Sequence, residues 1–169
     1  MAIGEGYARF YTKRGIPPMY HESELTVELA PNMLLRGDNG TGKTYQACAV
    51  LIHCYMTYQS SIGFVTANNY LREIRSTFGK HSTESDMDVF ERYAEVDRLV
   101  IDDIGAEKVG EFGLAEILAL VDHRVSYLKA TTITTNLTLQ EIHELEPRLA
   151  SRLASFDEIV MDGKDRRMQ

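Results

Sequence analysis

The sequence has few cysteines, no long apolar run and no export signal, and these absences exclude several classes of protein. Its only cysteines among 169 residues, Cys48 and Cys54, lie in one apolar stretch and indicate neither a disulfide framework nor a Cys-x-x-Cys site. No apolar run approaches the ~20 residues of a membrane span, and the opening residues lack the apolar core of a secretory signal. We therefore expect a cytoplasmic protein in a reducing setting, without membrane attachment.

Positive charge is also scarce. The chain has 18 lysines and arginines against 25 aspartates and glutamates, a formal net charge of −7. Because phosphate neutralisation supplies most non-specific affinity for nucleic acids, an acidic monomer binds DNA poorly without a local basic patch or an assembly. The five histidines show no spacing typical of a zinc site. Apolar residues make up 44% of the chain, which is enough for the core of one globular domain.

The apolar pattern predicts alternating strands and helices. Short apolar or β-branched runs predict strands over residues 33–36, 62–66, 99–101, 131–135 and 158–161. Longer periodic segments predict helices over residues 45–58, 68–78, 87–93, 114–125, 138–145 and 147–153. Such alternation is typical of a parallel sheet covered by helices on both faces. Basic and aromatic residues precede Pro17 and Pro18, so we expect residues 1–31 to form an N-terminal arm packed on a domain of residues 32–169.

The clearest motif lies between the first strand and the first long helix. It fits the phosphate-loop pattern G-x-x-x-x-G-K-[ST] at every constrained position and reads Gly37-Asp38-Asn39-Gly40-Thr41-Gly42-Lys43-Thr44, followed by Tyr45. Its glycines let backbone N–H groups turn towards phosphate oxygens, and the following helix adds the positive end of its dipole. In such loops the lysine, here Lys43, reaches the β- and γ-phosphates, and the hydroxyl, here that of Thr44, ligates Mg²⁺. A glycine-rich turn without a ligand is the alternative.

Two carboxylates end the apolar strand that begins at Leu99. A strand this apolar is central in the sheet, so its carboxyl end opens into the crevice where α/β sheets bind ligands. We expect Asp102 to hold Mg²⁺ through water and Asp103 to polarise an attacking water. The alternative is a strand that ends in solvated acids.

Three further segments carry polar residues that suit phosphate chemistry. Asn136 follows the strand over 131–135, and its amide suits a hydrogen bond to a γ-phosphate or attacking water, or a simple turn. Arg148 and Arg152 lie four residues apart on a short helix and face the same way, as in phosphate recognition or on a solvated face. Residues 163–167 form a basic segment after the last strand, with a frayed terminus as the alternative.

Together, these motifs resemble the ATPase domain of DnaC/IstB-like proteins, the AAA+ helicase loaders and transposition helper ATPases. The resemblance covers nearly all of residues 14–169. Its motifs are Gly-Ile-Pro-Pro at 15–18, the phosphate loop, Phe64-Val65-Thr66-Ala67, Leu99 to Gly105 with Glu107, Ile133 to Leu137, Arg148 to Leu153, and Gly163 to Arg167. It implies a P-loop α/β fold with five parallel strands in the order 5-1-4-3-2 and a reduced or absent helical lid.

The resemblance also implies roles for single residues. Asn136 corresponds to sensor 1, Arg152 to the arginine finger offered to a neighbouring subunit, and Arg167, with Arg166 as second choice, to the sensor 2 arginine. ATP or ADP and Mg²⁺ are the implied ligands. Most AAA+ ATPases carry Glu where this chain has Asp103, although paired aspartates are familiar in this family, so we expect slow turnover. The stretch between Pro18 and residue 33 is short, so we expect an early helix of the family to be missing, together with its helicase-binding N-terminal domain.

We therefore expect an ATP hydrolase of bacterial or phage origin that is slow alone and stimulated by assembly or DNA. The implied activity is that of a replicative helicase loader, a homo-oligomer in the ATP state, with a replicative helicase or a transposase as partner. Single-stranded DNA is the expected second partner, bound weakly through Arg72, Arg75, Lys80 and His81. The alternatives are a transposition helper and a nucleotide-switch module that barely hydrolyses ATP. A metabolic kinase is disfavoured, because the sequence shows no substrate lid.

Overall fold

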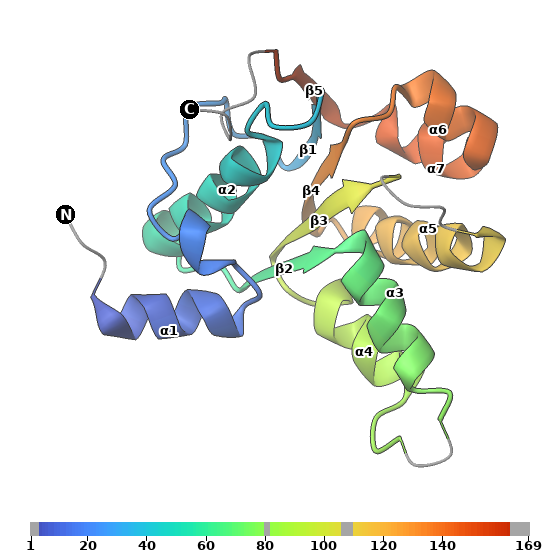
Figure 1. The fold of residues 1–169 in the computed structure, drawn as a ribbon, viewed down its shortest axis with the longest axis horizontal. Coiled ribbons are helices and arrows are strands. Elements are labelled where there is room, and N and C mark those ends of the chain that lie inside the picture. Colours follow the sequence, from blue (N-terminus) through green and yellow to red (C-terminus); the bar gives the residue numbers. More distant parts are fainter. Residues whose placement is uncertain (1–3, 80–81, 106–109, 163–169) are drawn as a thin grey trace.

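The structure is a computed structural model that describes residues 4–79, 82–105 and 110–162. The described residues contain a five-stranded parallel sheet, with strands β1 (Asn32–Arg36), β2 (Ile62–Thr66), β3 (Arg98–Ile104), β4 (Ala130–Thr135) and β5 (Asp157–Val160). Their order is β2-β3-β4-β1-β5, which is the expected order read from the other edge (Figure 1). Every predicted strand is confirmed.

Helices follow the strands along the chain. They are α1 (Glu5–Lys13), α2 (Lys43–Tyr58), α3 (Ala67–Ser76), α4 (Asp86–Ala94), α5 (Glu111–Ser126), α6 (Leu139–Leu145) and α7 (Pro147–Leu153), with a 3-10 turn, η1, at Pro18–Tyr20. The predicted helices are confirmed, but α2 begins earlier than predicted because Lys43 and Thr44 already belong to its first turn. No helix within the described ranges is long and apolar enough to cross a lipid bilayer.

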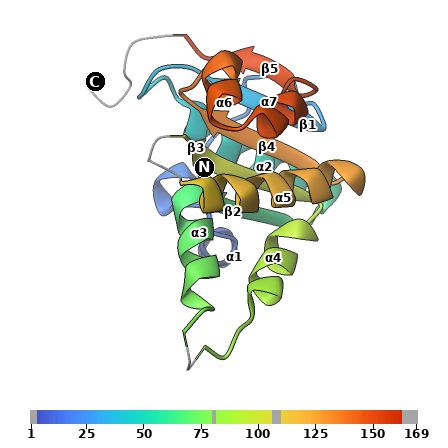
Figure 2. The same ribbon diagram turned by 90° about the vertical axis from the view of Figure 1, so that its right-hand side faces the viewer.

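The side chains of the strands alternate between two apolar layers. Met33 and Leu35 of β1 pack with α2 and the arm, whereas Leu34 packs with the layer built by α3, α4, α5 and α7. Figure 2 shows α3, α4 and α5 in front of the sheet, with α1 and α2 behind it. Because both faces are covered, the strands are apolar on both sides, which is why their sequences read as continuous apolar runs.

The N-terminal residues contain a helix that the sequence did not predict. In α1, Tyr11 is buried, and the ring of Phe10 stacks on that of Tyr55 of α2 with centroids 4.3 Å apart. The helix is therefore held by contacts with α2, which local sequence does not reveal. Residues 21–31 contain no helix.

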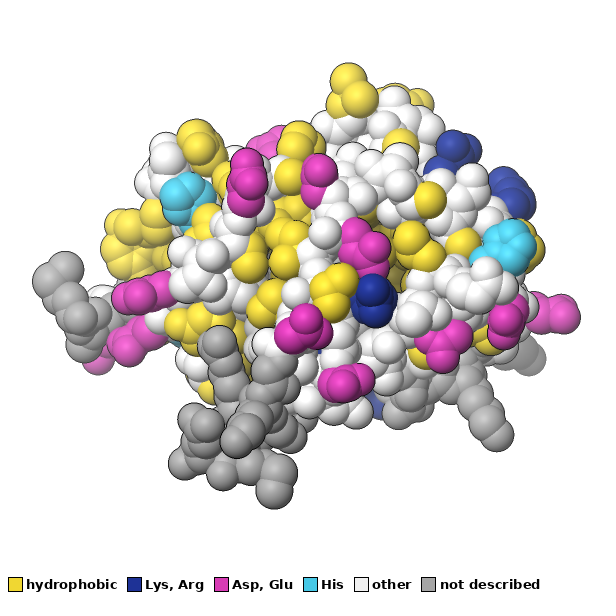
Figure 3. Space-filling model, turned by 90° about the horizontal axis from the view of Figure 1, so that it is seen from above, with side chains coloured by type: hydrophobic (Ala, Val, Ile, Leu, Met, Phe, Trp, Pro, Cys, Tyr) yellow, Lys and Arg dark blue, Asp and Glu magenta, His cyan; other side chains and the backbone are white. Residues whose placement is uncertain are grey.

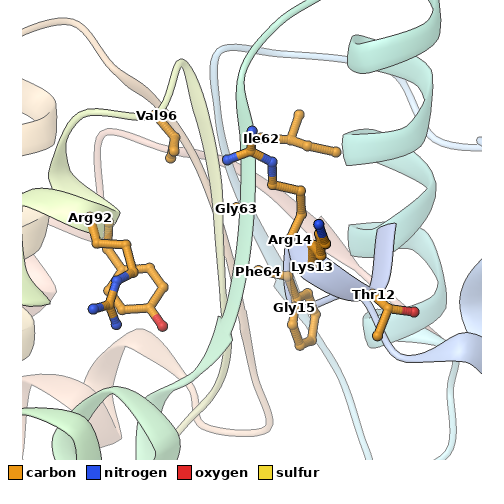
Figure 4. A pocket seen from close by; sticks show the side chains of 10 residues that line it. Thr12, Lys13, Arg14, Gly15, Ile62, Gly63, Phe64, Arg92 and Val96 are labelled. Atoms are coloured by element: carbon orange, nitrogen blue, oxygen red, sulfur yellow. The ribbon is translucent and has the colours of Figure 1, made fainter. Parts of the chain in front are cut away.

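After α1 the chain crosses the outer edge of β2. The N–H of Phe64 donates a hydrogen bond to the carbonyl of Arg14 over 2.8 Å. Gly15 has a φ of +86°, and a Cβ there would lie 2.1 Å from the Phe64 carbonyl oxygen, so this approach requires glycine. Figure 4 shows this crossing beside a cavity of about 330 Å³. The edge of β2 is thus covered, at this point, by the chain itself.

Candidate active site

The phosphate loop connects β1 to α2 and is curled around its own lysine. The ammonium of Lys43 donates to the carbonyls of Gly37 and Asp38 over 2.7 and 2.8 Å. The hydroxyl of Thr41 donates to the same Asp38 carbonyl over 2.9 Å. Gly42, with a φ of +95°, occupies the N-cap of α2 and lets the chain turn sharply into the helix. The loop and the N-terminus of α2 therefore border one space, which is the arrangement found at anion sites.

Asp102 lies at the centre of the site, on the middle strand β3. The residue is 6% exposed, and its carboxylate accepts hydrogen bonds from the hydroxyls of Thr134, over 2.7 Å, and Thr44, over 3.0 Å. Burial raises the pKa of Asp102, while the two hydroxyls and the charge of Lys43 act in the opposite direction and Asp103 adds to the rise. These bonds tie β3 to β4 and to the first turn of α2.

Asp103 reaches the same space through a break in the strand. Successive residues of a regular strand point to opposite faces, but the pairing of β3 with β4 shifts register between Ile101 and Ile104. Asp103 adopts a φ of +64°, and its N–H donates to the hydroxyl of Thr134 over 2.8 Å. A left-handed residue other than glycine costs on the order of 1–3 kcal/mol. This bulge is what brings two consecutive carboxyl groups to one cavity.

These groups line a cavity of about 730 Å³ at the carboxyl ends of the strands. Its lining consists of Met19, Tyr20, Asn39, Gly40, Gly42, Lys43, Thr44, Tyr45, Asp102, Asp103, Thr134 and Asn136. The volume lies in the range of small-molecule and cofactor sites. The structure therefore brings most of the predicted loop residues together with both acids and with Asn136, which is exposed.

The segment before β1 is attached to the start of α2, next to this cavity. The N–H of Glu24 donates to the hydroxyl of Tyr45 over 3.0 Å, and that of Thr26 donates to the side-chain carbonyl of Gln46 over 2.9 Å. The chain from η1 onwards is thus held beside the phosphate loop. This explains how Met19 and Tyr20, distant from the loop in sequence, come to line the cavity.

The predicted arginines lie elsewhere. Arg152 of α7 is not among the residues that line the cavity, and its guanidinium Nε donates instead to Asp122 of α5. Arg148 also faces Asp122, with Nη2 3.6 Å from the other carboxylate oxygen. Other predicted residues lie outside the described part of the chain, namely Lys80, His81, Glu107, Arg166 and Arg167.

Sequence reasoning missed four residues that contribute to the site or its surroundings. Met19, Tyr20 and Asp122 carry no local signal, because only long-range packing brings them to their neighbours. The position of Thr134 could have been predicted from the sequence. Adjacent parallel strands end together, so a threonine near the end of β4 lies beside the acid that ends β3.

The fold and the cavity together define a class of protein. A glycine-rich loop after β1, a buried acid ending β3 and an amide after β4 meet at one edge of a parallel sheet. This is an ATP-binding P-loop domain of the AAA+ class.

The family follows from comparison with known proteins. A family model of IstB-like ATP binding proteins matches residues 22–160, and the chain belongs to this family. The replicative helicase loader DnaC of Escherichia coli strain K12 is 27% identical over 114 residues, which are 68% of this chain and 46% of that protein. The chain therefore spans about half the length of the curated relatives it matches.

Solved structures share the fold. A crystal structure of the DnaC helicase loader has a TM-score of 0.66 at 19% identity, covering 96% of this chain and 93% of the other. The replication initiator DnaA bound to AMPPCP and single-stranded DNA has a TM-score of 0.68 at 17% identity, covering 97% of this chain and 49% of the other. The predicted resemblance and the predicted fold are confirmed.

Proposed function

We propose that the chain hydrolyses ATP, assembles head to tail with further copies on single-stranded DNA, and acts as a replicative helicase loader. The observation that carries the proposal is the cavity where the phosphate loop meets Asp102, Asp103 and Asn136, because this set suits transfer of a phosphoryl group to water. The relationship to a named helicase loader supports the cellular role.

The phosphate loop supplies the binding energy for the nucleotide. In the structure the Lys43 ammonium donates to two carbonyls of the loop. A bound triphosphate would replace these carbonyls with β- and γ-phosphate oxygens, which are stronger acceptors because they are charged. The first turn of α2 adds backbone N–H groups and the positive end of its dipole.

Thr44 and Asp102 suit a magnesium ion. Mg²⁺ prefers oxygen ligands and is usually held by one or two carboxylates together with substrate phosphates. A hydroxyl and a carboxylate lie here 3.0 Å apart, and burial has raised the pKa of that carboxyl, so a cation nearby would favour its ionised form. When bound, Mg²⁺ would neutralise charge on the β- and γ-phosphates.

Hydrolysis needs a water positioned opposite the bond that breaks. The Asp103 carboxylate would accept a hydrogen bond from this water, and the Asn136 amide would hold the water or the γ-phosphate. The water oxygen bonds to the γ-phosphorus as the bond to the bridging oxygen breaks, which leaves ADP and inorganic phosphate. Asp is one methylene shorter than Glu, so we expect the water to be held less firmly and turnover to be slow.

The location of Arg152 supports a role for a second copy of the chain. Its side chain is 51% exposed and lies on α7 beside α5, away from the cavity of its own subunit. Asymmetric, head-to-tail contacts between copies bring unlike surfaces together and generate rings or filaments. In such an assembly Arg152 would complete the nucleotide site of the next subunit, a contribution worth roughly 10³-fold or more in rate.

Exposed aromatic and basic side chains near the end of α3 support binding of single-stranded DNA. Phe78 is 62% exposed and Phe112 43% exposed, with ring centroids 6.0 Å apart. Arg72 and Arg75 are exposed on α3, and no ion pair is found for either within the described ranges. Aromatic rings stack on unpaired bases, and arginines contact the backbone.

The charge of the molecule sets the strength of this interaction. The upper face in Figure 3 shows scattered acidic and hydrophobic side chains with few basic ones, and the net charge is −7. A single subunit should therefore bind DNA weakly, and an assembly should bind it more tightly through several contacts at once.

The decisive experiment measures ATP turnover per subunit against protein concentration, with and without single-stranded DNA. We expect the rate to rise with concentration and to rise again with DNA. Lys43→Ala should abolish nucleotide binding. Arg152→Ala should reduce turnover by roughly 10³-fold while nucleotide binding persists.

Two results would contradict parts of the proposal. Unchanged turnover in Arg152→Ala would exclude a role for Arg152 as the arginine finger of the next subunit. A flat rate near zero, with ATP binding intact, would instead support a nucleotide-switch module that recruits a partner in its ATP-bound form.

A further inference from the structure

The outer face of α7 carries two arginines that share one carboxylate. Leu149, Ala150 and Leu153 are buried against the core, which leaves Arg148 and Arg152 on the other side of the helix. Both approach Asp122 of α5, one at each carboxylate oxygen. Asp122 is therefore placed between two cations that belong to another helix.

The contact with Arg152 uses only one part of the guanidinium. Nε donates to Asp122, and no hydrogen bond from either terminal nitrogen is found within the part of the chain that the structure describes. These terminal nitrogens form the planar edge that binds phosphate oxygens in a bidentate manner. The Asp122 carboxylate thus holds the guanidinium at Nε and leaves its two terminal nitrogens available to bind a phosphate.

This ion pair is poorly suited to stabilise the fold. The Arg152 side chain is half exposed, and exposed pairs contribute little to folding stability. Leu149 and Leu153 already attach α7 to the core. A contribution to orientation is a better account, because a long flexible side chain loses less rotamer freedom on binding if it is already directed.

We infer that Asp122 is a positioning residue for Arg152, orienting its guanidinium towards a phosphate group held by a neighbouring copy of the chain. This inference rests on the proposed function, in which Arg152 acts in the next subunit. Arg148 offers a matched control, because it shares the carboxylate but makes the longer contact and is more exposed.

Mixing two variants tests this role in isolation. Arg152→Ala subunits keep an intact nucleotide cavity but lack the finger, and Lys43→Ala subunits lack nucleotide binding but still offer the finger. We expect the mixture to turn over ATP, although neither variant does so alone. We call the Lys43→Ala subunit the donor, because it supplies Arg152 to its neighbour. Substitutions at Asp122 or Arg148 are then added to this donor, whose own nucleotide site is already inactive.

Adding Asp122→Ala to this donor should lower the turnover of the mixture roughly tenfold, as expected when a reacting group loses its orientation. Asp122→Glu should recover part of it, and Arg148→Ala should stay within about twofold of the parent donor. Melting temperatures of the donors should agree, which separates orientation from folding.

The remaining outcomes overturn the inference in distinguishable ways. Equal turnover with the Asp122→Ala donor would exclude positioning and leave the finger intact. Higher turnover would mean that Asp122 restrains Arg152 rather than directing it. If the mixture of Arg152→Ala and Lys43→Ala subunits shows no turnover, Arg152 does not act in the neighbouring subunit, and the positioning role of Asp122 is excluded as well.

Discussion

Asp102 and Asp103 are neighbours in the chain but lie in different environments. Asp102 is buried and accepts hydrogen bonds from two threonine hydroxyls, whereas Asp103 is exposed and left-handed. Thr134 connects them, since its hydroxyl accepts from the N–H of Asp103 and donates to the carboxylate of Asp102. One residue of β4 thus holds both acids in place.

The burial of Asp102 predicts a trade between stability and activity. Because burial raises its pKa, the folded protein holds a proton on this carboxyl more tightly than the unfolded chain does. Ionisation therefore costs stability as the pH rises through the folded-state pKa. We expect Asp102→Asn, without nucleotide, to melt at a higher temperature than the wild type at pH 7, with turnover reduced about 10²-fold or more.

Thermal melts at several pH values check this prediction. The difference should shrink as the pH falls towards the ordinary pKa of an aspartate, about 4, because the raised pKa of Asp102 lets the folded protein take up this proton above that value. Asp103→Asn is the control, because its carboxyl is exposed and its melting temperature should change little. A lower melting temperature for Asp102→Asn at pH 7 would contradict the reasoning.

At the scale of elements, the arm is joined to the edge of β2 where Gly15 passes close to Phe64. The edge of a sheet presents unpaired backbone groups, and here the chain after α1 crosses that edge at Gly15. We propose that residues 1–31 act as an arm of the ATPase domain, because Tyr11 and Ile16 are buried in the layer that α2 forms with the sheet.

Two glycine substitutions in this arm should differ in their effect on stability. Gly15→Ala places a methyl group 2.1 Å from the Phe64 carbonyl oxygen in a left-handed conformation, so we expect a loss of about 1–3 kcal/mol in unfolding free energy. Gly6→Ala, inside α1 with open space around it, should be neutral or stabilising by about 0.5–1 kcal/mol. Denaturant unfolding measures both, and equal effects would show that Gly15 does not constrain the arm.

At the scale of the whole molecule, the nucleotide cavity and Arg152 lie at different places on the subunit. The cavity is lined by residues of η1, the phosphate loop and the first turn of α2, and Arg152 lies on α7 in contact with Asp122 of α5. Figure 1 shows α2 and α7 on opposite sides of the sheet. In the proposed assembly, a contact between Arg152 of one copy and the cavity of the next joins unlike surfaces, so it is head to tail. DNA affinity should then depend on the assembly as well as on the single subunit.

Single-stranded DNA binding by the assembled protein tests the aromatic pair. Phe78→Ala should weaken binding by about 1–3 kcal/mol, which corresponds to roughly 5- to 150-fold in Kd. Tyr127→Ala is the matched control, because Tyr127 is an equally exposed aromatic residue after α5. Equal losses in the two variants would point to a non-specific effect, and no loss in Phe78→Ala would exclude stacking there.

Local chemistry made much of this protein predictable from its sequence. The phosphate loop needs glycines, a lysine and a hydroxyl at fixed spacing, so Lys43 and Thr44 were identifiable directly. Continuous apolar runs revealed central strands, and their carboxyl ends located Asp102 and Asn136 at one edge of the sheet. The order of the strands came from the family resemblance and agrees with the structure.

Only the tertiary structure decided the features that depend on contacts between distant segments. Arg124, in the last turn of α5, is fully buried and donates to the carbonyls of Tyr93, Ala94, Val96 and Ala130. Burial lowers its pKa to about 10. Nothing in its neighbours along the chain separates it from a surface arginine.

Contacts between distant segments also explain why the sequence did not reveal the bulge at Asp103, the arm across β2 and the Asp122–Arg152 contact. Each joins residues far apart in sequence or breaks the regular geometry of an element, so each is set by packing against other elements. The sequence alone determined the chemistry available to this protein, because motif chemistry is local. Folding decided which of those groups meet, because that depends on the packing of the whole chain.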